Sequence, residues 1–259
     1  MNAPMPSVSV MTWNVQRASA TRAVRQAQWL ASCAQADLIA LTEVAGGAAG
    51  ERLADALRAH GYQCQLPAGD GRDYRVLLGA RVGCLTPVAD VRAAHLPHRL
   101  AAGTVDLPGG RRVSLIGLYV PSRGTRDHRN VAKRAFQAAV AAVLPTLGPT
   151  FGPGMPVLVA GDLNVVEPGH QPPLAVFGAW EYDFYRVFAT AGFTDAFRHR
   201  QPDAVDHSWY GRHGTGYRID HLFCASAHID AVTRCRYLHH PRTSQLSDHA
   251  ALAADLTLT

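Results

Sequence analysis

The sequence predicts an α/β fold in which two mixed β-sheets pack face to face and helices cover both outer sides. Short apolar runs typical of strands are interrupted by long helical segments, without the strict alternation of strand and helix that builds one parallel sheet. In addition, 47% of the 259 residues are hydrophobic, and no linker-like stretch divides the chain. We therefore expect one domain over residues 1–259, with a large core.

The expected strands are short runs of apolar and β-branched residues. They cover residues 8–12, 37–42, 74–78, 113–119, 156–160, 217–224 and 250–258. Residues 148–156 are rich in glycine and proline, which indicates a loop before the fifth of these strands.

Four segments have helical periodicity, and they cover residues 21–36, 51–60, 130–144 and 182–191. In the first of them, Val24, Trp29, Leu30 and Cys33 fall roughly on one face, which we expect to be buried. A glycine directly follows the second and the fourth segment. Glycine is common there because it accepts the left-handed backbone that ends many helices.

The charge balance is compatible with a polyanionic partner. The chain has 25 Lys+Arg against 20 Asp+Glu, a formal net charge of +5, and the surface is more basic still if several of the acids bind metal. An ordinary surface carries a similar charge, so charge alone leaves both interpretations open. Lys133 is the only lysine, and the arginine excess fits either a compositional bias or a preference for bidentate phosphate contacts.

Cysteine usage and the apolar runs indicate a cytoplasmic protein. The five cysteines form no CxxC pair, which argues against a disulfide framework and against a structural zinc site. The first ten residues lack the basic start and apolar core of a signal peptide, and no apolar run approaches membrane-spanning length. We expect no membrane partner and no obligate protein partner.

Six short segments, each at the end of an apolar run, carry residue types that bind a hard cation or a phosphate. They are TWNVQ with Asn14, LTEV with Glu43, LYVPS with Tyr119, GDLN with Asp162 and Asn164, YRIDH with Asp220, and SDHA with Asp248 and His249. Taken singly, GDLN suits an Asp-Asn turn and SDH suits a helix N-cap. Their shared position favours one site, because ligands bind at the edge of layered α/β folds. Together they predict Mg²⁺-dependent cleavage of phosphodiesters.

In the order of these motifs, the chain resembles the exonuclease/endonuclease/phosphatase superfamily, and within it the exonuclease III-like abasic-site DNA repair nucleases. The likeness spans nearly the whole chain and is densest from GDLN onward, where GFTDAFRHRQP, HSWYG, GYRIDHLF and SDHAAL follow. GFTDAFRHRQP and SWYG hold no expected metal ligand, so they indicate the branch and not merely a shared chemistry. The resemblance implies a four-layer sandwich. Thr42 and Gln16 depart from the branch, which leaves the dominant activity open.

The expected metal site has oxygen ligands, because Mg²⁺ prefers oxygen and usually takes only one or two carboxylates from the protein. Mn²⁺ is expected to substitute for it. We expect Glu43 to be the first ligand, assisted by Asn14, with Asp248 close by. Glu43 emerges from an apolar strand at the place where the resembled family holds its metal. An ordinary surface carboxylate after a strand is the alternative for this residue.

The expected catalytic groups form two pairs. Asp162 and Asn164 are two residues apart on an extended segment, so they can project from one face, where one activates water and the other holds a phosphate oxygen. Asp220 is expected to bond one ring nitrogen of His249, orient the ring and favour its charged form. His221 should point the opposite way on the strand.

Aromatic residues near these motifs have two possible roles. A strand tyrosine such as Tyr119 usually packs in the core with its hydroxyl bonded to the backbone, whereas the resemblance places it against the scissile phosphate. Trp209, Tyr217 and Ile219 are similar to the apolar pocket that accepts a flipped abasic sugar in the resembled branch. Ordinary core packing is an equally open interpretation for these three.

The predicted partner is nucleic acid, foremost duplex DNA. Arg123, Arg126 and Arg129 follow Tyr119 on a polar loop and are expected to contact the phosphate backbone. The expected activity is abasic-site incision, with 3′-repair or 3′→5′ exonuclease activity in base excision repair.

Other functions remain open. Within the superfamily they are a less specific DNase, an RNA 3′ nuclease, and a phosphatase of lipid or sugar phosphates. GDLNVVE lacks the arginine that follows GDxN in the inositol phosphatase branch. A rival of another class is a nucleic-acid-binding protein without catalysis. The joint presence of the expected catalytic carboxylates, asparagine and histidine argues against it.

Overall fold

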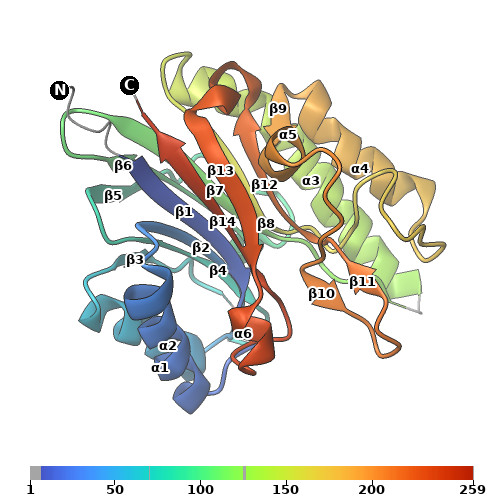
Figure 1. The fold of residues 1–259 in the computed structure, drawn as a ribbon, viewed down its shortest axis with the longest axis horizontal. Coiled ribbons are helices and arrows are strands. Elements are labelled where there is room, and N and C mark those ends of the chain that lie inside the picture. Colours follow the sequence, from blue (N-terminus) through green and yellow to red (C-terminus); the bar gives the residue numbers. More distant parts are fainter. Residues whose placement is uncertain (1–6, 70, 125–126, 259) are drawn as a thin grey trace.

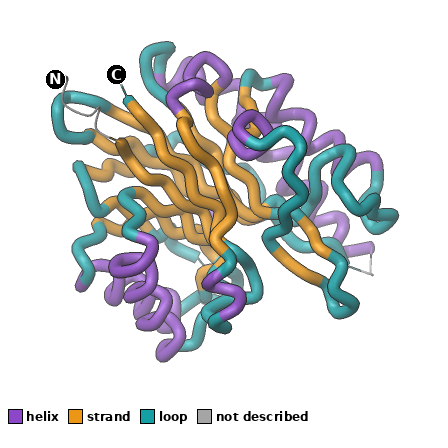
Figure 2. Tube along the Cα trace, viewed as in Figure 1, coloured by secondary structure: helices purple, strands orange, loops and turns teal. Residues whose placement is uncertain are grey.

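In the computed structural model, which describes residues 7–258 except 70, 125 and 126, two β-sheets lie face to face. Helices α1 and α2 cover the outer face of one sheet, and α3 and α4 cover the outer face of the other (Figure 1). The strands therefore form the centre of the molecule and the helices its two flanks (Figure 2). This is the expected α/β four-layer sandwich.

The two sheets are both mixed. The first has the order β13-β14-β1-β2-β4-β3 and the second the order β5-β6-β7-β8-β12-β9. The first comprises β1 (Ser7–Asn14), β2 (Leu38–Val44), β3 (Gln63–Gln65), β4 (Arg75–Ala80), β13 (Val232–Leu238) and β14 (Ala251–Thr257). The second comprises β5 (Cys84–Pro87), β6 (Leu100–Asp106), β7 (Arg112–Tyr119), β8 (Val157–Asp162), β9 (Phe193–Asp195) and β12 (Asp220–Ala225). A small hairpin is formed by β10 (Trp209–Tyr210) and β11 (Gly216–Tyr217).

The four predicted helices differ from the structure mainly at their ends, and the two short helices α5 (Ala196–Arg200) and α6 (His240–Thr243) were not predicted. In the structure, the four predicted helices are α1 (Ala20–Trp29), α2 (Ala48–Ala59), α3 (Asp127–Phe151) and α4 (Ala179–Thr190). A π-helical turn follows α1, and both Val24 and Cys33 are exposed, because Ala23, Gln26 and Ala27 form the buried stripe instead. The predicted loop at 148–156 is also wrong in part, since α3 continues past two prolines to Phe151.

The strand prediction was incomplete at the sheet edges and wrong at one join. The four edge strands of the two sheets, β3, β5, β9 and β13, were not predicted, nor were the inner strand β6 and the hairpin strand β10. The expected strand 217–224 is interrupted, because β11 ends at Tyr217 and β12 begins at Asp220. The main-chain N–H of Arg218 donates to His170, and the N–H groups of Ile219 and Asp220 donate to the hydroxyl of Ser208, so this backbone bonds side chains in place of a neighbouring strand.

Alternation along the strands separates three hydrophobic layers. On β2, Leu38 and Ala40 face the second sheet, whereas Ile39 and Leu41 face α1 and α2. A third layer lies between the second sheet and α3 and α4. No helix in the described part of the chain is long and apolar enough to cross a membrane.

A close approach between β7 and β8 requires glycine just before Asp162. Gly161 has φ +153, and a Cβ there would lie 1.9 Å from the main-chain oxygen of Leu118, its partner across the parallel ladder. We therefore expect Gly161→Ala to lower the free energy of unfolding by about 2 kcal/mol or more, because the clash is with backbone. Urea unfolding measures this.

Gly154→Ala is the matched control. Apart from the two chain neighbours, no atom of the described residues lies within 4 Å of the added Cβ, and the φ of Gly154 is not in the left-handed region. An equal effect of the two changes on stability would contradict the packing argument.

Candidate active site

Polar side chains gather where strand ends of the two sheets meet. Asn14 ends β1, Tyr119 ends β7 and Asp162 ends β8. The parallel pairing of β1 with β2 sets Asn14 against Thr42, beside Glu43, and the pairing of β7 with β8 sets Tyr119 against Asp162. Four of the six sequence motifs thus reach one edge of the sandwich.

The other two motifs reach the same edge from the opposite direction. Asp220 is the first residue of β12 and lies directly opposite Asp162, and His249 precedes β14. The expectation that these two motifs end apolar runs is therefore wrong. Because β12 and β14 run antiparallel to β8 and β1, their beginnings meet the ends of those strands.

A distortion in β2 directs Glu43 into the site. In a regular strand, Glu43 would face the helices like Ile39 and Leu41. The register of β2 against β4 shifts between Leu41 and Val44, and Glu43 has φ +54, in the left-handed region. Such a bulge changes where a side chain points and is common beside active sites. Here it leaves Val44 in the core and turns Glu43 toward the second sheet.

Asn14 connects the acidic groups of both sheets. Its Nδ2 donates to Glu43 Oε2 over 3.1 Å and to Asp162 Oδ2 over 2.9 Å, while its Oδ1 accepts from the main-chain N–H of Gln16 over 2.8 Å. Asn14 is buried. It therefore acts as a bridge between the two carboxylates.

Asp162 is buried next to a second acid. Burial first, and then the charge of Asp220, raise the pKa of Asp162 to about 7, although His249 and hydrogen bonds from Asn164 and Asn14 act in the opposite direction. The main-chain N–H of Asn164 donates to Asp162 Oδ1 over 2.8 Å. The Asp-Asn turn considered for GDLN is thus present, and it lies within the site.

His249 is paired with Asp220. Its Nδ1 lies 2.7 Å from Asp220 Oδ2, and both residues are buried. Burial opposes the charged ring, but the charge and hydrogen bond of Asp220 outweigh it and raise the pKa of His249 to about 10. The ring is therefore a cation at neutral pH, and its Nε2 lies 3.9 Å from Asp248 Oδ1. Since β14 follows it, SDH does not form a helix N-cap.

Tyr119 bonds a side chain and not the backbone. Its hydroxyl donates to Glu43 Oε2 over 3.1 Å, and its ring lies against Tyr74 and the guanidinium of Arg99. Burial, together with the charge of Glu43, raises the pKa of Tyr119 well above its usual value. The hydroxyl therefore stays protonated and can donate to an anion.

A cavity of about 470 Å³ opens beside these polar groups. Its polar lining includes Asn14, Glu43, Tyr119, Asp162, Asn164, His249, Ser122 and Arg123. Trp209, Tyr217 and Ile219 line the apolar side, and the Trp209 and Tyr217 rings lie 5.3 Å apart. Phe177 also lines this side and was missed, because nothing in its Gly/Pro-containing loop distinguishes it from a packing residue.

Two carboxylate oxygens at the site are buried without a hydrogen-bond partner among the described residues. They are Oδ1 of Asp248 and Oδ1 of Asp220. Asp248 Oδ2 accepts from the indole of Trp209 over 3.0 Å. Asp162, Asp220 and His249 each offer one potential ligand atom, and these three atoms lie within 4.8 Å of one another. Unpartnered carboxylate oxygens fit a hard divalent cation, whereas a protonated His249 does not serve as a ligand.

The three arginines expected to bind substrate are only partly placed. Arg123 lines the cavity, and its Nη1 donates to Glu181 over 2.7 Å. Arg126 lies outside the described residues. Arg129 belongs to α3, and its side chain lies outside the described part of the structure.

Comparison with known proteins identifies the family. The Endonuclease/Exonuclease/phosphatase family matches residues 11–249. The chain belongs to this family. Its members are hydrolases of phosphate esters that depend on a divalent metal. No curated protein matches the chain by sequence.

Solved structures share the fold at low identity. The 3′ phosphatase NExo from Neisseria, bound to a product DNA hairpin, has a TM-score of 0.79 and 22% identity, over 96% of this chain and 99% of that chain. An AP endonuclease from Archaeoglobus fulgidus has a TM-score of 0.77 and 18% identity, over 95% and 98%. The AP endonuclease LMAP from Leishmania major has a TM-score of 0.76 and 18% identity, over 98% and 89%.

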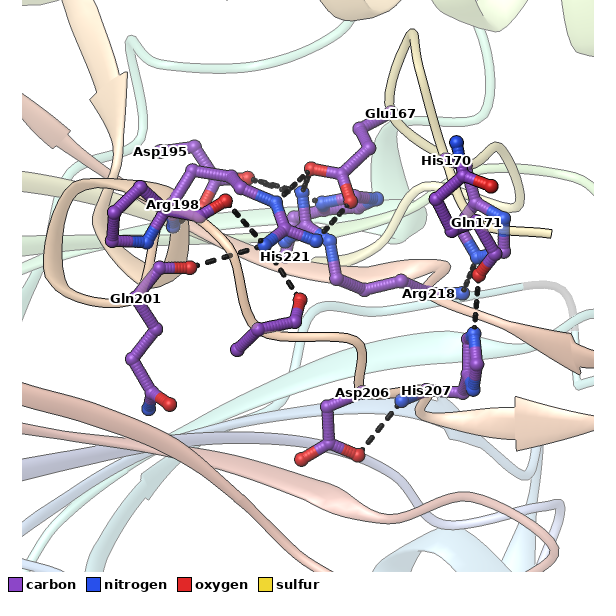
Figure 3. Close-up of polar contacts among 12 residues, drawn as sticks. Glu167, His170, Gln171, Asp195, Arg198, Gln201, Asp206, His207, Arg218 and His221 are labelled. Atoms are coloured by element: carbon purple, nitrogen blue, oxygen red, sulfur yellow. Dashed lines mark hydrogen bonds and ion pairs between the residues drawn. The ribbon is translucent and has the colours of Figure 1, made fainter. Parts of the chain in front are cut away.

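A buried ionic cluster fixes the backbone next to the GDLN and YRIDH segments. Arg218, two residues before Asp220, bonds the carboxylates of Glu167 and Asp195 (Figure 3). Arg198 donates to both oxygens of Glu167, over 2.7 and 2.6 Å. His221 lies in the same cluster, 3.4 Å from Asp195, and so points away from the cavity as expected. The cluster joins the loop after β8 to the start of β12.

This cluster predicts a loss of stability in acid. Burial opposes ionisation, but the hydrogen bond from Arg198 and the charge of Arg218 lower the pKa of Glu167 from 4.5 to about 2. A carboxyl whose pKa is depressed on folding contributes stability above its unfolded pKa and loses it as pH falls toward its folded pKa. We expect Glu167→Gln to destabilise strongly above pH 5 and progressively less toward pH 2, as measured by urea unfolding across this range.

Asp183→Asn serves as the control, because Asp183 and its partner Arg186 are both exposed, so the change should alter stability little at any pH. A Glu167→Gln effect that does not vary with pH would contradict the ion-pair account.

Proposed function

We propose that this chain is a Mg²⁺-dependent DNA phosphodiesterase of the exonuclease III-like branch, which incises at abasic sites and removes blocking groups or nucleotides from 3′ ends. The observation that carries this proposal is the buried group of Asp162, Asp220 and His249. Asp162 and His249 line a cavity whose other side is apolar. The protonated ring of His249 suits the negative charge of a phosphate, and the carboxylate of Asp162 suits a base that activates water. The apolar side of the cavity suits the sugar attached to that phosphate.

The metal would be held by Glu43 and Asp248, with Asn14 orienting Glu43. When bound, it would supply Lewis-acid stabilisation of the charge that develops on the phosphoryl oxygens. Oxygen donors without thiolates favour Mg²⁺ or Mn²⁺ over zinc. The five free cysteines fit a reducing compartment such as the cytoplasm.

The chain's own groups divide the remaining chemistry. Protonated His249, held by Asp220, would contact a phosphoryl oxygen and stabilise its charge while water attacks in line. Asp162 would accept the proton of that water, because its raised pKa lies near neutral pH. Asn164 would hold a second phosphate oxygen by exchanging its 3.2 Å bond to Asp162 Oδ2 for one to the phosphate. The hydroxyl of Tyr119 would likewise turn its hydrogen from Glu43 Oε2 to the phosphate.

The apolar side of the cavity supports a base-free sugar as the ligand. Trp209, Tyr217, Ile219 and Phe177 offer ring and aliphatic surface in a cavity of about 470 Å³. These walls offer mainly apolar contacts, which suit the apolar face of a flipped abasic sugar. The fold shared with two AP endonucleases and with a 3′ phosphatase bound to DNA is consistent with this choice.

A panel of labelled oligonucleotides tests the function. We expect cleavage, in Mg²⁺, of a duplex that carries one abasic-site analogue and of a nicked duplex that ends in a 3′-phosphate. Undamaged duplex and matched RNA should be cut more slowly, and EDTA should stop every reaction. Equal cleavage of RNA and DNA would contradict the assignment of DNA as the substrate. Full activity in EDTA would contradict the dependence on a metal.

The Asp220–His249 pair gives a second prediction. His249→Ala should lower kcat by about 10³-fold, because the stabilising cation is lost. Asp220→Asn should be milder, since the amide oxygen can still orient the ring but the charge that raises its pKa is gone.

The double variant should lose little more than His249→Ala alone, because one interaction cannot be lost twice. Steady-state kinetics on the abasic duplex measures this. Fully additive losses would show that the two residues act separately.

A further inference from the structure

The only lysine of the chain is buried beside the GDLN turn. Lys133 lies on α3, and its Nζ donates to the main-chain oxygen of Asn164 over 2.8 Å and to Glu181 Oε1 over 2.5 Å. Both Lys133 and Glu181 are fully buried. Burial lowers the pKa of Lys133, and the charge of Glu181 opposes that shift. A buried charge pair is weak evidence for added stability, which directs attention to what the pair holds in place.

Glu181 connects this lysine to two walls of the cavity. Its Oε2 accepts from Arg123 Nη1 over 2.7 Å and from the main-chain N–H of Gly178 over 2.9 Å. Arg123 lines the cavity, and Gly178 directly follows Phe177, which lines it too. The ammonium group of Lys133 also lies 5.8 Å from the Phe177 ring. The carboxylate of Glu181 therefore connects three segments, namely the loop after β7, helix α3 and the N-terminus of α4.

The Asn164 turn needs a contact that fixes its backbone. Asn164 has φ +48, a conformation that costs energy for a residue with a side chain. Its Nδ2 donates to Val120 O over 2.9 Å and to Asp162 Oδ2 over 3.2 Å. These bonds hold the side chain, and the bond from Lys133 holds the peptide carbonyl.

We propose that Lys133 and Glu181 form a positioning pair that sets the Asn164 turn, Arg123 and the Phe177 segment for reaction. The inference rests on the proposed phosphodiesterase function. Neither residue reaches the substrate, because both are enclosed; they act through the residues they hold. Lys133 holds the turn through its bond to the carbonyl of Asn164. Glu181 supports the turn through Lys133 and also holds Arg123, which lines the cavity.

Kinetics of two variants separate these roles. Lys133→Met removes the donor to Asn164 and leaves Glu181 bonded to Arg123 and Gly178. It should lower kcat on the order of 10²-fold with little change in KM, as small displacements of catalytic groups do. Glu181→Gln should lower kcat and also raise KM, because Arg123 loses its anionic partner.

A double-variant cycle tests whether Lys133 acts through Asn164. Asn164→Gly removes the side chain and keeps the positive φ accessible. In that background, Lys133→Met should cause no further loss of kcat. A full 10²-fold loss there would overturn the inference. If Lys133→Met alone fails to fold, Lys133→Met/Glu181→Gln, which removes both buried charges, is compared with Glu181→Gln in both backgrounds, so that the effect through Arg123 cancels.

Hydrogen exchange gives a readout that does not need activity. Lys133→Met should speed exchange in residues 160–168, whereas the control Arg200→Met should not. Arg200 also donates to main-chain oxygens, those of Val232 and Asp230, away from the cavity. If the unmodified protein cleaves no phosphodiester, the proposed function fails and exchange still decides the positioning role. Unchanged exchange in 160–168 would overturn it.

Discussion

Two buried acids that face each other across one pair of strands constrain the rest of this site. Asp162 and Asp220 lie in register on β8 and β12, and like charges at that spacing are unfavourable without compensation. The compensation comes from the other sheet and from the segment before β14. Asn14 donates to Asp162, and His249 pairs with Asp220. The two sheets must therefore meet at this edge for the acids to remain buried and ionisable.

Several irregular features follow from this requirement. The left-handed Glu43 leaves the regular strand so that its carboxylate can share Asn14 with Asp162. Gly161 permits the close approach of β7. Behind the site, the Arg218 cluster fixes the start of β12, and the pair of Lys133 and Glu181 supports the turn after β8. The irregular backbone at the edge is thus held in place by buried ion pairs that contact the segments around it.

The sequence predicted the layered fold, and it predicted that polar residues of the six segments would gather at one edge, because both depend on local signals. Apolar runs identify strands, and polar residues at their ends identify the edge. It could not predict that β12 and β14 approach this edge from the opposite direction, since strand direction depends on long-range pairing. Nor could it reveal Phe177, Glu181 or the carbonyl contact of Lys133. These residues look like ordinary packing or surface positions until the tertiary structure places them beside Asn164 and Arg123.

Calorimetric titration of Mg²⁺ tests the central claim most directly, namely that this edge is a metal-dependent hydrolytic centre. The account predicts that the unmodified protein binds Mg²⁺, that Glu43→Gln weakens the affinity on the order of tenfold or more, and that Asp162→Asn largely preserves it. The difference arises because Glu43 is assigned to the metal and Asp162 to the attacking water. Equal affinities in all three proteins, or an equal loss in both variants, would contradict this division of roles.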